Sequence, residues 1–209
     1  MWLVYYISLR RNKRKDFMKK LFLSIGLMVM SLCVMAQTES SHLTFRGISI
    51  DGNINAFVSK LEAKGYEKKK SIENGYIMEG SFMGRTCELY VFCSPTSRLA
   101  TKVTAYYPKD NSWSSIKSDY EACKEQYTKK YGKPTDTFEF FMDPYYEGDG
   151  FELQAIRLEK AVYCSFWKSS EGIILLKISE YEQISITYED AQNIEVMENE
   201  RDAKIQDEI

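Results

Sequence analysis

One acidic loop holds the residues whose types and spacing come closest to a catalytic or metal-binding set. The segment DPYYEGDG carries three carboxylates, at Asp143, Glu147 and Asp149. Two carboxylates can act as general acid and base when one has a raised pKa, and several on one loop can bind calcium. The spacing is not that of an EF-hand, however, and turn formation alone explains acidic residues beside glycine. Tyr145 and Tyr146 in the same loop are candidate contacts to a sugar or a partner.

The histidine and the cysteines do not complete a catalytic set. His42, the only histidine, lies in a short N-terminal lead-in, so nucleophile–histidine arrangements have no well-placed base. No zinc-binding spacing and no phosphate-binding glycine motif is present, and we expect no cofactor and no metal. Two disulfides and four buried free thiols are equally consistent with the remaining cysteines, which are Cys87, Cys93, Cys123 and Cys164.

The cysteines also suggest a contact. Cys123 lies on an expected helix stripe, while the other three fall in expected strands. We predict that Cys123 lies across the core from one of the strand cysteines. A bond between two of them requires Cα atoms within about 7 Å.

Alternation in the strand-like segments predicts a sheet face rich in aromatic rings. In Thr86–Cys93, one side carries small apolar residues, which suit a covered core, and the other carries aromatic rings. In Ala161–Lys168, we expect Val162, Cys164 and Phe166 to point into the core. Exposed sheet faces are usually polar, and clustered aromatic residues are typical of interfaces. The candidate binding residues are therefore Tyr90, Phe92, Tyr106, Tyr163 and Trp167, unless the C-terminal tail or a second subunit covers them permanently.

The N-terminus predicts export. Residues 18–36 combine two lysines, an apolar run and Ala36, which is the pattern of a signal peptide cleaved after Ala36. Residues 1–17 precede it and suggest a start codon assigned too early, or an unusually long leader. Lipoprotein processing at Cys33 needs a small preceding residue, and Leu32 stands there, so we expect no acylation. The expected location is the periplasm or the exterior of the cell.

The net charge of the mature chain limits the kinds of partner that it can bind. Removal of 36 of the 209 residues leaves 173, enough for one domain. The leader holds seven of the 28 Lys and Arg residues and one of the 30 Asp and Glu residues, which leaves 21 basic and 29 acidic residues. A net charge near −8 disfavours nucleic acid and anionic membrane surfaces. We therefore expect a protein or a small envelope ligand as the partner, and no membrane insertion after cleavage.

One strongly periodic segment organises the expected fold. Ser112–Tyr131 places apolar residues at helical spacing, and Gly132 follows where a helix should end. A shorter helix is expected from Ile54 to Leu61, after turn residues. The expected strands are 43–50, 76–83, 86–93, 99–107, 135–142, 152–158, 161–168, 173–179 and 184–188, with 68–74 as a charged connection.

These elements predict an α+β fold. We expect a single domain over residues 37–188, with an antiparallel sheet of about seven strands and two helices on one face. A helix followed by several strands occurs twice, which is consistent with a tandem repeat and resembles in layout exported protease and β-lactamase inhibitors. Residues 189–209 form a charged tail that we expect to be helical.

The chain resembles a group of uncharacterised exported proteins of anaerobic gut bacteria. The residues that carry the resemblance are Ala36-Gln37, LTFRGISIDG, KGY, and the run from SWSSIKSDY to KKYGKP. It covers most of the mature chain and implies export without implying any activity. The sequence thus favours a non-catalytic binding or inhibitor-like module that uses an aromatic sheet face. The alternative is a carboxylate-dependent hydrolase of the cell envelope.

Overall fold

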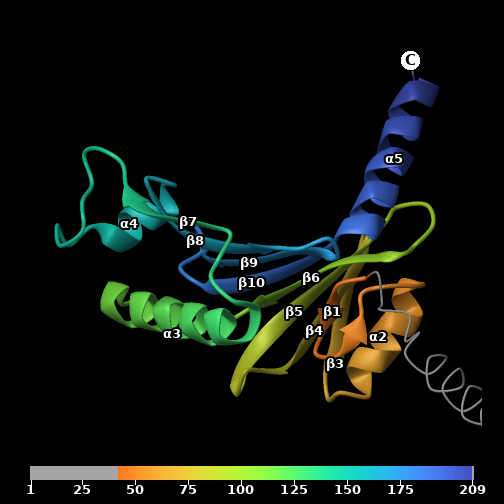
Figure 1. Cartoon of the computed structure of the whole chain (residues 1–209), viewed down its shortest axis with the longest axis horizontal. Coiled ribbons are helices and arrows are strands. Elements are labelled where there is room, and N and C mark those ends of the chain that lie inside the picture. Colours follow the sequence, from red (N-terminus) through yellow and green to blue (C-terminus); the bar gives the residue numbers. More distant parts are fainter. Residues whose placement is uncertain (1–41, 209) are drawn as a thin grey trace, which may run out of the picture. The chain divides into compact units, whose positions relative to one another are not determined.

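A computed structural model describes residues 42–208, which are dominated by one antiparallel sheet (Figure 1). Within this range the sheet has eight strands: β3 (Glu67–Ile72), β4 (Gly75–Phe82), β5 (Arg85–Cys93), β6 (Ala100–Tyr106), β7 (Asp136–Phe141), β8 (Ala161–Lys168), β9 (Gly172–Ile178) and β10 (Ile184–Asp190). Their order is β3-β4-β5-β6-β10-β9-β8-β7. The predicted α+β class with a large antiparallel sheet is confirmed, with eight strands in place of about seven.

Four helices accompany the sheet in the described range: α2 (Ile54–Glu62), α3 (Trp113–Tyr131), α4 (Glu152–Arg157) and α5 (Ala191–Glu208). In Figure 1, α2 and α3 lie on the same side of the sheet. We call this side the helix face; its central row of paired residues is Leu89, Ala105, Ile186 and Leu176, all fully buried. We call the other side the open face; its matching row is Tyr90, Thr104, Thr187 and Leu175.

Helix α3 forms as its sequence predicts. The Ser112 side chain caps the first turn by accepting a hydrogen bond from the Ser115 amide at 3.4 Å. Gly132 ends the helix at a φ of +83°, which favours glycine. The buried stripe is Ile116, Tyr120, Cys123 and Tyr127. We call β3 to β6 the first half of the sheet and β7 to β10 the second half. Helix α3 therefore covers the second half with aromatic rings. The first half is covered by the aliphatic and phenyl side chains of α2: Ile54, Phe57, Val58 and Leu61.

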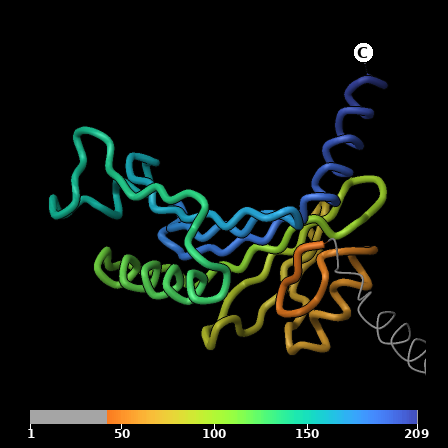
Figure 2. Tube along the Cα trace, viewed as in Figure 1, coloured from red at the N-terminus to blue at the C-terminus, as the bar shows by residue number. Residues whose placement is uncertain are grey.

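The order of elements repeats along the chain. Helix α2 is followed by the strands β3 to β6, and α3 is followed by β7 to β10, with α4 inserted. The last strands of the two sets, β6 and β10, pair with each other at the centre of the sheet (Figure 2). The predicted helix-plus-strands order thus occurs twice within one continuous sheet.

The secondary structure predicted for two segments is wrong. The segment 68–74, expected as a connection, forms most of β3, an edge strand that is exposed along nearly its whole length. The segment 152–158, expected as a strand, forms α4 and its C-cap. Ala155 and Ile156 are its buried residues, and so short an apolar pattern does not distinguish a helix from a strand.

The start of the described chain also differs from the expectation. The predicted strand 43–50 is a small hairpin of β1 (Thr44–Phe45) and β2 (Ile48–Ser49). Its turn, Arg46-Gly47, has positive φ at both residues. The predictions about the leader, its cleavage site and Cys33 lie outside the described residues.

The C-terminal segment is helical. Helix α5 follows β10 directly and extends away from the sheet in Figure 1. Asn193 is its buried residue, and Glu200 accepts hydrogen bonds from the Thr96 and Ser97 amides at 2.8 and 3.0 Å. None of the helices within residues 42–208 combines the length and apolar character that a bilayer crossing requires.

Candidate functional site

The first half of the open face carries the aromatic cluster that the sequence predicts. Tyr90, Phe92 and Tyr106 are half-buried, and none points into the helix face. The Tyr90 ring meets Tyr106 edge-on at 5.2 Å and stacks on Phe92 at 6.4 Å. Burial raises the pKa of Tyr90 and of Tyr106, so both hydroxyls stay protonated at neutral pH. These rings therefore present apolar surface with neutral hydrogen-bonding tips.

The expected outward orientation of Tyr163 and Trp167 is wrong. Both are buried, 5% and 6% exposed, on the helix face beneath α3. Trp167 donates its ring N–H to the Gly132 carbonyl at 2.9 Å, and Tyr163 lies edge-on to Trp113 at 5.0 Å. Apolar residues lie on both sides of β8, so its pattern could not select the buried side. The rings of Tyr163 and Trp167 have polar atoms, and the side facing α3 provides partners for them.

The reversed orientation of β8 gives the second half of the open face its own apolar cluster. Phe138 and Phe140 on β7 are 46% and 42% exposed. Phe138 meets Phe166 edge-on at 6.2 Å, and Phe166 pairs across the sheet with Leu175. Cys164 pairs with Phe138 on the same face. The sequence analysis missed this cluster, although the alternation of phenylalanine in β7 was a usable signal.

Polar contacts between neighbouring strands separate and frame the two apolar clusters. Thr104 and Thr187 share a hydrogen bond of 3.0 Å at the centre of the face. Lys102 pairs with Glu189 at 3.5 Å, and Lys168 pairs with Asp136 at 2.7 Å. The charges in these pairs are thus neutralised within the face.

The Tyr106 end of the open face is hollowed. A cavity of about 620 Å³ there is lined by Tyr90, Tyr106 and charged residues near the β9–β10 turn. Glu182 lies at its edge and forms ion pairs with Lys109, at 2.5 Å, and with Arg157. Burial opposes ionisation of Glu182, but the two cations outweigh it and hold the pKa of its carboxyl below the ordinary value. This carboxylate is therefore a fixed anion rather than a proton donor.

The acidic loop lies elsewhere. Glu147 forms an ion pair with Lys117 of α3, which lowers the pKa of its carboxyl. Asp149 accepts hydrogen bonds from the Tyr146 and Phe151 amides at 3.0 and 2.7 Å, which is turn chemistry. These contacts tie the loop to itself and to α3.

The other candidate residues of the acidic loop, Asp143, Tyr145 and Tyr146, do not converge on one site. Asp143 is exposed, Tyr146 is 65% exposed, and the Tyr145 hydroxyl accepts a hydrogen bond from Gln154 at 3.1 Å. In the described range, 42–208, no group of three or more His, Cys, Asp or Glu side chains is placed to hold a metal ion.

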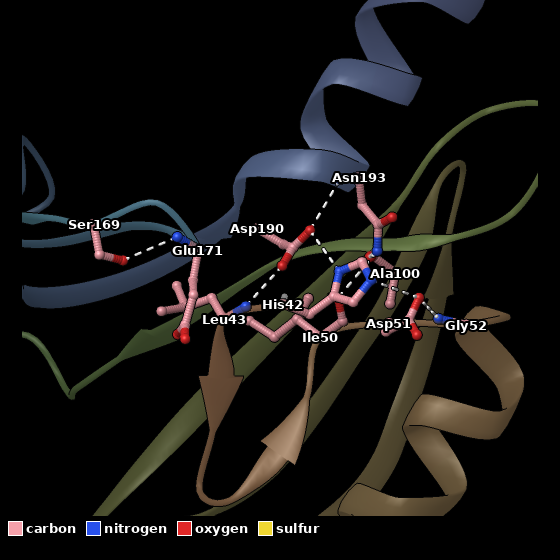
Figure 3. A network of polar contacts seen from close by, with 10 residues as sticks. All are labelled: His42, Leu43, Ile50, Asp51, Gly52, Ala100, Ser169, Glu171, Asp190 and Asn193. Atoms are coloured by element: carbon pink, nitrogen blue, oxygen red, sulfur yellow. Dashed lines mark hydrogen bonds and ion pairs between the residues drawn. The ribbon is translucent and has the colours of Figure 1, made fainter. Parts of the chain in front are cut away.

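His42 is part of a network that joins the start of the described chain to α5 (Figure 3). Its Nδ1 lies 3.0 Å from the buried Asp190 carboxylate, which also accepts from the Leu43 amide at 2.8 Å and the Asn193 amide at 2.9 Å. Asn193 in turn donates to the carbonyls of Ile50 and Ala100. His42, expected in the N-terminal lead-in, is therefore held by the folded domain. A carboxylate whose partners lie on two segments, residues 42–43 and the start of α5, is explained as a structural clasp.

The four described cysteines are free thiols. Cys87, Cys93 and Cys123 are buried on the helix face, as expected. That Cys123 lies across the core from one of the strand cysteines stays a prediction. Cys164, expected to face the core, is instead half-buried on the open face.

Comparison with models of protein families, with curated proteins and with solved structures gives no match. Any functional assignment therefore depends on the geometry described above.

Proposed function

We propose that this protein is an exported, non-catalytic binding module that recognises a partner protein through the open face. The observation that carries the proposal is the exposure of two apolar clusters on a sheet face that ordinarily carries polar residues. An inhibitor of an envelope or secreted enzyme is one form of such a module, in keeping with the tandem helix-and-strand layout.

The charges of the open face favour a protein over other large partners. Nucleic acid and anionic lipid require unpaired positive charge, whereas Lys102 and Lys168 are each paired with a carboxylate of the same face. Aromatic clusters with a polar, internally neutral surround are typical of protein interfaces. The partner surface should therefore be apolar at its centre and near neutral opposite the central threonines.

The alternative, a carboxylate-dependent hydrolase, has less support. A general acid needs a raised pKa, but the lysine partner of Glu147 lowers it, and Asp149 is engaged by backbone amides. The loop is also separate from the aromatic surface. Both features favour binding over turnover.

Site-specific photo-crosslinking tests the proposal. Replacing Tyr90 or Phe166 with p-benzoylphenylalanine should give one discrete crosslinked protein on irradiation of producing cells. The same replacement at Lys60, on the exposed side of α2, is the matched control and should give none.

The captured protein is then purified and titrated against a variant with Tyr90, Phe92 and Phe166 all replaced by serine. We expect this variant to fold and to bind about thirtyfold more weakly or worse, as loss of interface hot spots predicts. Unfolding of the variant would mean that the rings belong to the core. Undiminished binding, together with a turnover that Glu147→Gln removes, would instead favour the hydrolase.

A further inference from the structure

A second cavity lies on the opposite side of the molecule from the open face, at the C-terminal end of α3. It has a volume of about 440 Å³, which is within the range of small-molecule sites. The last turns of α3, the β4–β5 turn and the β1–β2 turn surround it. Three segments that are distant in sequence therefore converge on one pocket.

The floor of this pocket is aromatic. Phe82, Tyr127 and Tyr188 line it, and each is less than 8% exposed. The hydroxyls of Tyr127 and Tyr188 hydrogen-bond to each other at 2.6 Å. Tyr131, stacked on Tyr127 at 5.7 Å, extends the aromatic wall to the surface. An apolar body of a ligand would find flat rings on several sides.

The residues at the two turns are unusual for their backbone positions. Arg46 has φ of +51° and Met83 has φ of +50°, and a glycine with positive φ follows each. Two-residue hairpin turns of this kind favour Asn, Asp or Gly at the first position, because other side chains are strained there. Here the chain has an arginine and a methionine instead, and both line the pocket. The hairpins alone do not require either side chain.

The rim is positive. Arg46 is held in place by donating to the Ser81 carbonyl at 2.9 Å and to the Tyr66 hydroxyl at 3.3 Å. Lys130 lies over the Tyr131 ring at 4.7 Å. Within residues 42–208, neither Arg46 nor Lys130 forms an ion pair with a carboxylate, and no acidic side chain lines the pocket.

The sum of these charges remains positive. Lys129 also lines the pocket but is neutralised by Glu125 at 2.6 Å. The C-terminal end of α3 contributes about half a negative charge. Two unpaired cations against this half charge leave a net of about +1.5.

We propose that this pocket binds a small amphipathic carboxylate. Its apolar body would lie against the tyrosine and phenylalanine floor, and its carboxylate would lie between Arg46 and Lys130. Met83, 41% exposed at the mouth, is a flexible apolar side chain that can close over such a ligand. The site is independent of the open face and of the protein partner proposed there.

Two probes of the same shape and opposite charge test the proposal. Naphthalene-2-carboxylate and naphthalen-2-ylmethylammonium are titrated into the purified protein by calorimetry, with ligand-observed NMR to detect weak binding. We expect the carboxylate to bind at least tenfold more tightly than the ammonium compound, and its affinity to fall with added salt.

Single substitutions test whether the carboxylate binds in this pocket. Lys130→Glu should weaken carboxylate binding about tenfold or more, since it reverses one rim charge without removing a described hydrogen bond. Lys64→Glu, an exposed change on the α2 side, is the control and should have no effect. The triple serine variant of the open face should also bind the carboxylate normally.

Three results would overturn the assignment. They are equal affinity for the two probes, absence of saturable carboxylate binding at millimolar concentration, and equal losses for Lys130→Glu and Lys64→Glu. Each can occur whether or not the open face binds a protein.

Discussion

Aromatic side chains occur on both faces of the sheet, but the two faces differ in how buried the rings are and in whether their polar atoms have hydrogen-bond partners. On the helix face, Tyr120 hydrogen-bonds to Ser165 at 2.8 Å, and Trp167 donates to the Gly132 carbonyl. On the open face, Phe138 and Phe166 contact each other and remain partly exposed to solvent. A ring whose polar atom has a buried partner contributes to folding. A ring that keeps part of its area exposed at the surface is available for a second molecule.

Adjacent residues of β8 give the sharpest test of this difference. Trp167→Ala should cost about 3–5 kcal/mol of unfolding free energy, because it empties a buried site and removes a hydrogen bond. Phe166→Ala, one residue earlier on the open face, should cost no more than about 1 kcal/mol. Urea denaturation of both variants measures the two values. Similar losses would mean that the open face is also core.

A second adjacent pair lies at the end of β10. Asp190 is fully buried and accepts hydrogen bonds from the Leu43 and Asn193 amides, so Asp190→Ala should cost about 3 kcal/mol. Glu189 pairs with Lys102 near solvent, and Glu189→Ala should cost less than about 1 kcal/mol. The same denaturation experiment applies. If Asp190→Ala costs as little unfolding free energy as Glu189→Ala, the Asp190 network does not act as a structural clasp.

Alkaline pH should destabilise the protein because it ionises cysteine thiols that are buried on the helix face. Burial raises the pKa of the Cys87 thiol and of the Cys123 thiol to about 11, from an ordinary value of 9.0. Between these values the unfolded chain loses protons that the folded chain keeps, so stability falls as pH rises from about 9 to about 11. The urea midpoint measured across this window should therefore decrease.

Matched cysteine variants assign the effect. Cys123→Ala should reduce the slope of the midpoint against pH, whereas Cys164→Ala, on the open face, should change it less. A midpoint that stays constant or rises above pH 9 would contradict the burial of these thiols.

The contrast between the faces also explains which elements the sequence predicted. Helix α3 was predicted with its caps because one side is apolar, and Ser112 and Gly132 mark its ends. Strand β5 was oriented correctly because Glu88 stands on the open side, while Leu89 and Val91 stand on the other. In α3 the polar side, and in β5 the carboxylate of Glu88, mark the side that faces away from the core.

Elements without such a contrast were not predictable. Strand β8 has apolar residues on both sides, so Tyr163 and Trp167 were assigned to the wrong face. Strand β3 is polar throughout because it forms the edge of the sheet, and its pairing with β4, rather than its own pattern, makes it a strand. The outward orientation expected for Tyr90, Phe92 and Tyr106 therefore agrees with the structure, whereas that expected for Tyr163 and Trp167 does not.

The most direct test of the binding face uses Cys164, because it is a native thiol on the open face and the other described thiols are buried. Its rate of alkylation by a membrane-permeant maleimide is measured in intact producing cells and in purified protein at the same pH, each normalised to an engineered reference, Lys60→Cys on α2. If a partner covers the open face, Cys164 should react roughly tenfold more slowly in cells, and the purified protein should lose this protection. Equal normalised rates would contradict the central claim, because they would leave the open face uncovered where the protein acts.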